Sequence, residues 1–279
     1  MAYGYLVLAV IIATTLTSGN RQVRSLGTVI VAAGLAMIAV SIVLANLDGT
    51  FAGHAARSTG LEAWTPIMLN LQAAVALLTL PFLLWVAWAQ WRRGAVSTPG
   101  AFNAAARFGQ VSRVLHWATA TLVLIMIPMG LFASILPAGS VERPMFLAAH
   151  QSLGMTVLVF GAARLVWLLV SPAPPLSPAM KAWERRLARL SHLGLYALIL
   201  GFPLTGFLLS TAQGDGMDIF GLGVEPAFAP DARLGQLAEG LHNVGLPFLF
   251  YAIILAHVGA VLKHHFADNR RDDLRRMIT

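Results

Sequence analysis

The chain has 279 residues, of which 57% are hydrophobic and only 11% are charged, and its mean hydropathy is +0.72. A soluble globular domain carries roughly 25% charged residues, so this composition excludes a water-soluble fold. The net charge of +7 does not indicate nucleic-acid binding, because the basic residues stand between long apolar runs and form no patch. Without cysteine there is no disulfide, thiolate metal site or covalently attached c-type haem, so any redox centre must be held by histidine or methionine.

Long apolar segments follow one another along the whole chain. A helix that crosses the hydrocarbon core of a bilayer needs about 20 mostly apolar residues, and seven segments meet or approach that length. They are Tyr3–Thr17, Gly27–Asn46, Pro66–Gln90, Val114–Leu136, Met145–Val170, Leu190–Thr211 and Val244–Val261. The first lacks a basic start and a small-residue cleavage site, so we expect it to be retained and not removed as a signal. The predicted fold is therefore an all-α integral membrane protein with seven transmembrane helices.

Lysine and arginine are distributed unevenly between the loops. One set of alternate loops holds fifteen of them: Arg21, Arg24, Arg92, Arg93, Arg107, Arg113, Lys181, Arg185, Arg186, Arg189, Lys263, Arg270, Arg271, Arg275 and Arg276. The other set holds only Arg57, Arg143 and Arg233. The positive-inside rule then predicts a C-terminus in the cytoplasm and an N-terminus on the outer side of the membrane.

A polar segment divides the chain into two parts. It runs from Arg92 to Arg113 and contains Pro99, so we expect a linker with a boundary near residue 100. Residues 1–100 then form a three-helix transmembrane region of unassigned role, and residues 101–279 form a four-helix domain. For the first part we expect anchoring, assembly or docking of a partner.

Three polar residues of the first part have ordinary explanations. Asn70 and Gln72 fall within a predicted span, where interhelical hydrogen bonds account for them. His54 falls in an outer loop, where we expect it to be solvated.

Histidines are concentrated in the last four predicted helices. Five of the eight lie in these helices or at their edges: His116, His150, His192, His242 and His257. An ionisable side chain at membrane depth is costly and suggests a function. A single histidine in a span can equally be an interhelical hydrogen-bond donor, so the argument depends on how several of them are arranged.

The depths of four of these histidines match in pairs. His116 follows Arg113 at the cytoplasmic entry of its helix, and His150 lies near the outer entry of the next. The last helix carries His242 near its outer start and His257 fifteen residues later, which is about 22 Å along the axis and roughly 4.2 turns. This spacing predicts an outer pair, His150 with His242, and an inner pair, His116 with His257.

Paired imidazoles on separate helices are typical of bis-histidine haem sites, because haem iron takes an axial ligand from each face of the porphyrin. Zinc would need three or four ligands at one level, and a proton relay of histidines is the remaining alternative. Gly130 and Gly206 fall at the outer level and Gly154 one turn from His150, where small residues make room for a macrocycle or for ordinary helix packing. Arg164 falls at the inner level, as a haem-propionate partner or as a snorkelling arginine. We therefore expect a C-terminal four-helix bundle that holds two non-covalent b-type haems.

Four stretches of this bundle resemble the bacterial cytochrome b561 family. They are SRVLHWATATLVL at 112–124, AHQSLGMTVLVFGAARLVWLL at 149–169, LSHLGLYALILGFPLTGFLLS at 190–210 and ILAHVGAVLKHHF at 254–266, which LRRM follows. The resemblance covers about three fifths of the chain, from about Phe108 to Thr279. It implies axial ligation by His116, His150, His242 and His257, and electron exchange with membrane ubiquinone, with superoxide or a partner dehydrogenase as the donor. It also implies a multi-pass protein of the bacterial inner membrane, so that the outer N-terminus is periplasmic.

One departure from the family pattern concerns His242. The family usually has one residue fewer between the two ligands of the last helix, and here Pro247 lies between them. Since a single inserted residue is commonly absorbed as a π-bulge, we expect His242 to remain a ligand.

Further residues near the inner level are candidates for the quinone. They are His192 with Tyr196, and His264 and His265 beside Lys263, which can supply protons and polar contacts to a quinone or act as interfacial groups or propionate partners.

The leading hypothesis is a quinone-linked di-haem cytochrome, a superoxide oxidase-like oxidoreductase that carries electrons across the bilayer. The alternatives are a non-catalytic electron-transfer subunit of a larger complex and a haemless membrane adaptor. In each case we expect lipid around the protein and partner redox subunits or a second copy at the N-terminal helices.

Overall fold

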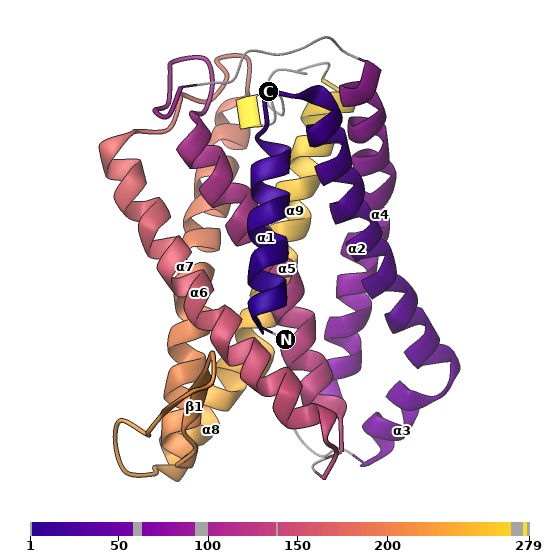
Figure 1. Ribbon diagram of the computed structural model, residues 1–279, viewed down its shortest axis with the longest axis vertical. Coiled ribbons are helices and arrows are strands. Elements are labelled where there is room, and N and C mark those ends of the chain that lie inside the picture. The colour runs from indigo at the N-terminus through magenta and orange to yellow at the C-terminus, as the bar shows by residue number, and fades with distance from the viewer. Residues whose placement is uncertain (1, 58–62, 93–99, 138, 269–275, 278–279) are drawn as a thin grey trace.

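The computed structural model describes residues 2–57, 63–92, 100–137, 139–268 and 276–277, apart from the side chains of residues 54–57 and 78. Helices dominate these ranges, and the long ones run side by side along the longest axis of the molecule (Figure 1). In chain order the elements are α1 (Ala2–Leu16), α2 (Arg21–Leu47), α3 (Thr50–Arg57), α4 (Thr65–Arg92), α5 (Gln110–Ile135), α6 (Glu142–Val170), α7 (Ala182–Gln213), β1 (Met217–Ile219), β2 (Leu222–Val224), α8 (Ala232–Gly240), the π-helical turn η2 (Leu241–Gly245) and α9 (Leu246–Phe266).

The membrane character expected from composition is confirmed. Six of the described helices are long and apolar enough to cross a bilayer: α2, α4, α5, α6, α7 and the continuous helix of 35 residues from Ala232 to Phe266. Helix α1 is also apolar but has 15 residues, which is about 22 Å and less than the ~30 Å hydrocarbon core. The all-α membrane fold therefore agrees with prediction, and the count of seven spans depends on this short first helix.

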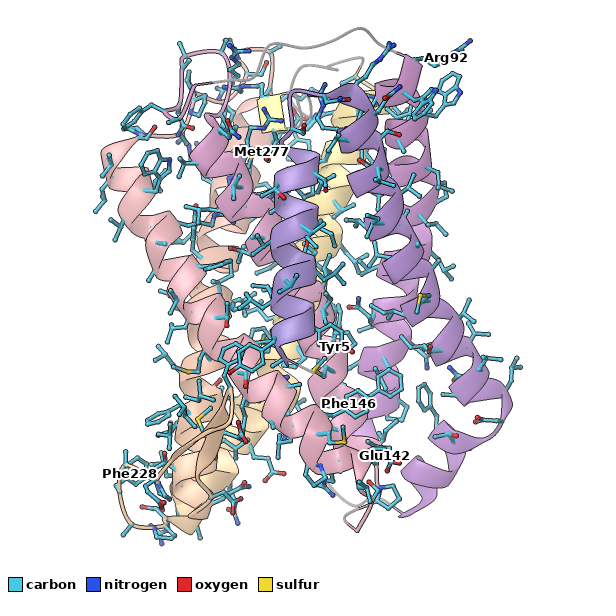
Figure 2. The ribbon with its side chains drawn as sticks, in the orientation of Figure 1. Tyr5, Arg92, Glu142, Phe146, Phe228 and Met277 are labelled. Atoms are coloured by element: carbon cyan, nitrogen blue, oxygen red, sulfur yellow. The ribbon has the colours of Figure 1, made fainter. Side chains whose placement is uncertain are left out.

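The two sets of loops lie at opposite ends of the helices. Arg92 and Met277 lie at one end of the molecule, whereas Glu142 and Phe228 lie at the other (Figure 2). The described members of the basic set stand at the first end, at the start of α2, the end of α4, the starts of α5 and α7 and the end of α9. Arg93, Arg270, Arg271, Arg275 and the side chain of Arg57 lie outside the described residues.

The four C-terminal helices form a bundle that the first part of the chain completes. Helix α5 packs against α6, α6 against α7, and α7 against α9. Helix α4 contacts both α9 and α5, while α1 packs against α5 and α6, and α2 packs along α4. Helices α1 and α4 therefore contact the bundle directly, whereas α2 packs against α1 and α4.

The helix that carries His242 begins earlier than its apolar pattern indicates. Helix α8 starts at Ala232, because the side chain of Asp231 caps it by accepting hydrogen bonds from the backbone N–H groups of Arg233 (2.9 Å) and Leu234 (3.0 Å). The apolar pattern places this start at Val244, because α8 contains polar residues. The π-helical turn η2 then joins α8 to α9 without a break.

A small hairpin that the sequence did not predict covers the end of the bundle near His150. Strands β1 and β2 pair antiparallel, with Ile219 opposite Leu222. The backbone N–H of Phe220 donates to Ser152 Oγ of α6 at 2.9 Å, and the hydroxyl of Tyr3 donates to the carbonyl oxygen of Phe220 at 2.9 Å. The hairpin is thereby attached to α6 two residues from His150 and to the start of α1.

The two amides predicted to bond between helices behave differently. Asn46 of α2 donates through Nδ2 to Oδ1 of Asn70 in α4 at 2.8 Å, which confirms the expectation for Asn70. Gln72 is fully buried, and neither Nε2 nor Oε1 has a hydrogen-bond partner in the part of the chain that the structure describes. The prediction of an interhelical hydrogen bond for Gln72 is therefore wrong. The side chain of His54 lies outside the described residues, so its predicted solvation stays a prediction.

Gln72→Leu is expected to raise the free energy of unfolding by about 1 kcal/mol, because it removes a buried amide that has no partner. The measurement is reversible unfolding in mixed detergent micelles. Asn70→Leu is the matched control, and the loss of its interhelical bond should lower stability by about 0.6 kcal/mol. A clear loss of stability in Gln72→Leu would contradict the prediction.

Candidate functional site

The structure brings the predicted outer pair of histidines together. The rings of His150 on α6 and His242 on η2 have centroids 5.9 Å apart and lie nearly perpendicular, at 85°. The two residues are 92 positions apart in the chain, and only the packing of the bundle makes them neighbours.

Hydrogen bonds at Nδ1 orient both rings of the outer pair. His150 Nδ1 lies 2.9 Å from the carbonyl oxygen of Met126, and since a carbonyl only accepts, Nδ1 carries the proton. His242 Nδ1 lies 3.1 Å from Thr205 Oγ1, whose own proton is directed to the carbonyl oxygen of Gly201 at 2.7 Å, so His242 also donates from Nδ1. In both rings the lone pair is left on Nε2, which is how second-shell bonds prepare a histidine to bind a metal.

Two glycines make the space that these rings occupy. A Cβ atom added to Gly130 of α5 would lie 2.6 Å from His150 Cε1, and one added to Gly206 of α7 would lie 2.9 Å from His242 Cε1. Gly154 is less crowded, because the nearest described atom to its added Cβ would be Met126 Sδ, at 3.5 Å. Gly130 and Gly206 thus lie at the level of the outer histidines, as their spacing predicted.

The π-bulge expected beside His242 is present. Residues 241–245 form one π-helical turn, with His242 as its second residue, and Pro247 follows in the first turn of α9. A π-turn accommodates one extra residue without breaking the helix. The additional residue between His242 and His257 is therefore absorbed before the proline, and His242 still faces His150.

Three histidines, an arginine and a tyrosine gather at the inner level. His257 of α9 contacts His192 of α7, with ring centroids 5.4 Å apart, and the guanidinium of Arg164 lies 5.2 Å from the ring centre of Tyr196. His116 of α5 is within electrostatic reach of His257, His192 and Arg164. Its Nδ1 is buried and has no hydrogen-bond partner among the described residues.

The inner group differs from prediction in one respect. His116 is within electrostatic reach of His257, but the ring contact of His257 is with His192. The sequence indicated the level of His192 from its position near the start of its helix, and no sequence signal indicated the contact.

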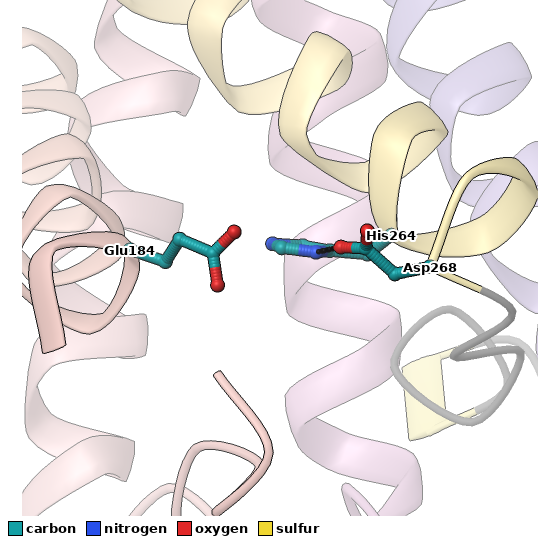
Figure 3. A group of neighbouring side chains, drawn as sticks. All are labelled: Glu184, His264 and Asp268. Carbon is teal, nitrogen blue, oxygen red and sulfur yellow. Dashed lines mark hydrogen bonds and ion pairs between the residues drawn. The ribbon is translucent and has the colours of Figure 1, made fainter. Parts of the chain in front are cut away.

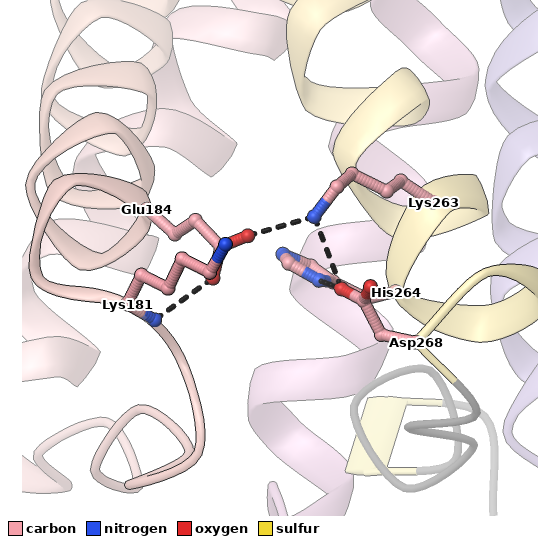
Figure 4. Close-up of polar contacts among 5 residues, drawn as sticks. All are labelled: Lys181, Glu184, Lys263, His264 and Asp268. Atoms are coloured by element: carbon pink, nitrogen blue, oxygen red, sulfur yellow. Dashed lines mark hydrogen bonds and ion pairs between the residues drawn. The ribbon is translucent and has the colours of Figure 1, made fainter.

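A separate charged cluster, which contains Lys263, His264, Glu184 and Asp268, ties the start of α7 to the end of α9. Lys263 Nζ donates to Glu184 Oε1 at 2.7 Å and to Asp268 Oδ2 at 3.1 Å, and His264 Nδ1 lies 2.8 Å from the same Asp268 oxygen (Figure 4). Glu184 also accepts a bond from the backbone N–H of Lys181 at 2.8 Å, which caps α7.

The same cluster has the composition of a metal site but already holds a cation. Ligand atoms of Glu184, His264 and Asp268 lie within 4.8 Å of one another (Figure 3). The ammonium of Lys263 already bonds both carboxylates, so a metal ion would have to displace it. We therefore assign the cluster a structural role, in which His264 is an ion-pair partner of Asp268.

The other candidate quinone contact at this end packs against the first part of the chain. His265 is buried, and its ring centroid lies 4.7 Å from that of Trp85 and 6.0 Å from that of Phe82, both on α4. His265 therefore belongs to the contact between α4 and α9.

Six long apolar helices, with histidines paired inside the bundle, define a membrane protein of the cytochrome b class. Comparison with known proteins specifies the class further. The chain belongs to the prokaryotic cytochrome b561 family, whose family model matches residues 107–279.

Over this C-terminal part, the chain is similar to three bacterial proteins. It is 31% identical to "Cytochrome b561 homolog 2" of Escherichia coli (strain K12), over 63% of this chain and 93% of the relative. It is 30% identical to "Cytochrome b561 homolog 1" of the same organism, over 61% of this chain and 97% of the relative. It is 28% identical to "Probable superoxide oxidase CybB" of Yersinia pestis, over 58% of this chain and 91% of the relative. Membership in the family establishes membrane electron transfer and implies haem b.

Proposed function

We propose that this protein is a di-haem cytochrome b, with one haem between His150 and His242 and a second between His116 and His257. The observation that carries the proposal is the outer pair, in which two half-buried imidazoles meet with Nδ1 occupied and Nε2 free to bind. A different observation supports the inner site: Nδ1 of His116 is buried and has no hydrogen-bond partner among the described residues, and a buried polar atom without a partner suggests a missing ligand. When bound, each haem iron supplies a one-electron carrier within the bilayer.

Other residues of the chain would position and tune these groups. Gly130 and Gly206 keep side chains away from the outer imidazoles, and the apolar helices exclude water from them. Arg164 supplies a positive charge at the inner level, where a haem propionate would be stabilised by it. Met126 and Thr205 hold the outer ligands in the orientation that binding requires.

We propose that electrons move between a donor on the outer side and ubiquinone in the inner membrane. The excess of lysine and arginine at the end that carries Arg92 and Met277 supports a cytoplasmic assignment for that end. The N-terminus is then periplasmic and the C-terminus cytoplasmic. Superoxide is a candidate donor because one relative is named a probable superoxide oxidase.

A second function is favoured by the N-terminal helices. The family match begins at residue 107, so α1, α2 and α4 are additional to the shared bundle. In this alternative, residues 1–100 are a docking region, and residues 101–279 are the haem-binding domain of an electron-transfer subunit in a larger complex.

A reduced-minus-oxidised spectrum with a pyridine haemochrome assay tests the proposal. We expect two haems b per chain, and reduction of both by a quinol or by superoxide in the purified protein. A response that appears only with an added partner would favour the subunit, and a colourless folded preparation would refute both functions.

A further inference from the structure

Two residues near the C-terminus, Arg276 and Met277, are bonded to segments far away in the chain, and we call them the C-terminal clasp. They lie at the basic end of the molecule, where Figure 2 labels Met277. The carbonyl oxygen of Arg276 accepts a hydrogen bond from the backbone N–H of Phe108 at 3.2 Å. The Arg276 guanidinium donates through Nε to the carbonyl oxygen of Ala106 at 3.0 Å and through Nη2 to that of Pro175 at 2.9 Å. The clasp therefore joins the segment before α5 to the loop between α6 and α7.

The second residue of the clasp is bonded to side chains of α5. Arg113 donates through Nε to the carbonyl oxygen of Met277 at 3.0 Å, and Trp117 donates through Nε1 to the same oxygen at 3.3 Å. Arg113 is only 1% exposed, so its guanidinium depends on acceptors inside the protein. The ring of Trp117 packs against that of His116, with centroids 5.1 Å apart. Met277, Trp117 and His116 therefore form a continuous series of contacts from the clasp to a proposed inner haem ligand.

The two segments that the clasp joins are also bonded to each other. The backbone N–H of Asn103 donates to Ser171 Oγ at 2.8 Å, and Asn103 Nδ2 donates to the carbonyl oxygens of Ser171 at 2.7 Å and Pro172 at 3.2 Å. The rings of Phe102 and Trp167 are stacked, with centroids 5.2 Å apart. The segment before α5, the loop after α6 and the clasp thus form one connected layer at this end of the bundle.

A layer of this kind decides which redox partners can approach the inner haem. The shell around a metal site controls the access of solvent to it, and a water-soluble partner would have to approach His116 through this layer. A quinone is dissolved in the hydrocarbon core and can approach between the helices. Five hydrogen bonds between described residues hold the clasp, and the side chain of Arg276 makes two of them. Arg276 is therefore the side chain of the clasp on which its position depends most.

We propose that Arg276 is a specificity-determining residue, because it holds the C-terminal clasp where it keeps water-soluble redox partners from the inner haem and leaves exchange with a lipid-soluble one. Arg276 acts through Met277 and Trp117, so it is a positioning residue. The inference rests on the proposed function, because it concerns the partner of the proposed inner haem.

Oxidation of the reduced full-length protein by ferricyanide tests the inference. Inverted membrane vesicles present the end proposed to be cytoplasmic to this oxidant, which does not cross the bilayer. One electron passes from each ferrous haem to one ferricyanide, which becomes ferrocyanide, and stopped-flow absorbance follows the loss of reduced haem. Arg276→Ala should react about tenfold faster than the wild type, because the clasp loses two of its hydrogen bonds. The loss of a positive charge would by itself slow an anionic oxidant, so a faster reaction is not an effect of charge.

Arg186→Ala is the matched control, because it removes the same charge from an exposed arginine at the start of α7. It should not react faster than the wild type. Trp117→Phe keeps an aromatic ring beside His116 and removes only the N–H that bonds Met277, so we expect a smaller increase than in Arg276→Ala. Decylubiquinone should oxidise the wild type and all three variants at similar rates, since it approaches through the lipid.

Hydrogen exchange at the amide of Phe108 supplies a readout that does not involve haem. This N–H donates to Arg276, and its exchange should be about tenfold faster in Arg276→Ala. The inference is wrong if Arg276→Ala keeps both haems and reacts with ferricyanide like the wild type. It is also wrong if this variant loses the inner haem, because the clasp would then build the site and not shield it. Failure of the proposed function would appear in the wild type, as missing haem or as no reaction with decylubiquinone.

Discussion

His242→Ala is expected to reduce the haem content from two haems b per chain to one. The outer haem would lose one of its two axial ligands, and the ring of His150 would face the space left by the imidazole. His257 of the proposed inner pair lies fifteen residues further along the helix, about 22 Å away. The inner haem should therefore keep its low-spin spectrum. The measurement is a pyridine haemochrome count together with the optical spectrum of the purified variant.

His264→Ala is the matched control for this substitution. It removes a histidine from the same continuous helix, but one that is bonded to Asp268 in the charged cluster, so both haems should remain. Retention of two low-spin centres in His242→Ala would show that the outer ligand is assigned wrongly.

The inner site needs its own comparison, because His257 contacts His192 and not His116 directly. His116→Ala should remove the inner haem, whereas His192→Ala should leave both haems in place and change only their environment. The reverse result would make His192 the axial ligand.

Gly130→Ala is expected to cause loss of the outer haem without removing any ligand. The added methyl group would lie 2.6 Å from Cε1 and 2.7 Å from Nδ1 of His150, so the ring would have to move. Movement would break the hydrogen bond of His150 to the carbonyl oxygen of Met126. It would also turn Nε2 of His150 away from the proposed haem site between His150 and His242. We expect at least a tenfold loss of outer haem occupancy, measured as the haem count after purification.

Gly154→Ala is the control for the glycine substitution. It adds the same methyl group to the neighbouring helix, where the nearest atom is Met126 Sδ at an ordinary contact distance of 3.5 Å. The control should bind two haems. If Gly130→Ala also binds two, with an unchanged spectrum, the small residue at this position serves helix packing alone.

The sequence by itself determined the features that depend on local composition. A long apolar segment must be helical inside a bilayer, because its backbone groups have no water with which to form hydrogen bonds. The lysine and arginine residues of the loops set the direction in which each helix crosses the membrane. For this reason the long helices and the segregation of basic loops were predictable. The matched depths of His150 and His242 follow from counting residues along helices, and the extra residue after His242 indicated the π-turn now seen at 241–245.

Only the tertiary structure decided which faces of the helices meet. Asn70 and Gln72 are both amides within one apolar segment, yet Asn70 forms a hydrogen bond with Asn46 and Gln72 has no hydrogen-bond partner among the described residues. The contacts of His192 with His257 and of His265 with Trp85 join residues far apart in the chain. Such contacts depend on the rotation and tilt of each helix, which packing against its neighbours sets and hydropathy does not encode.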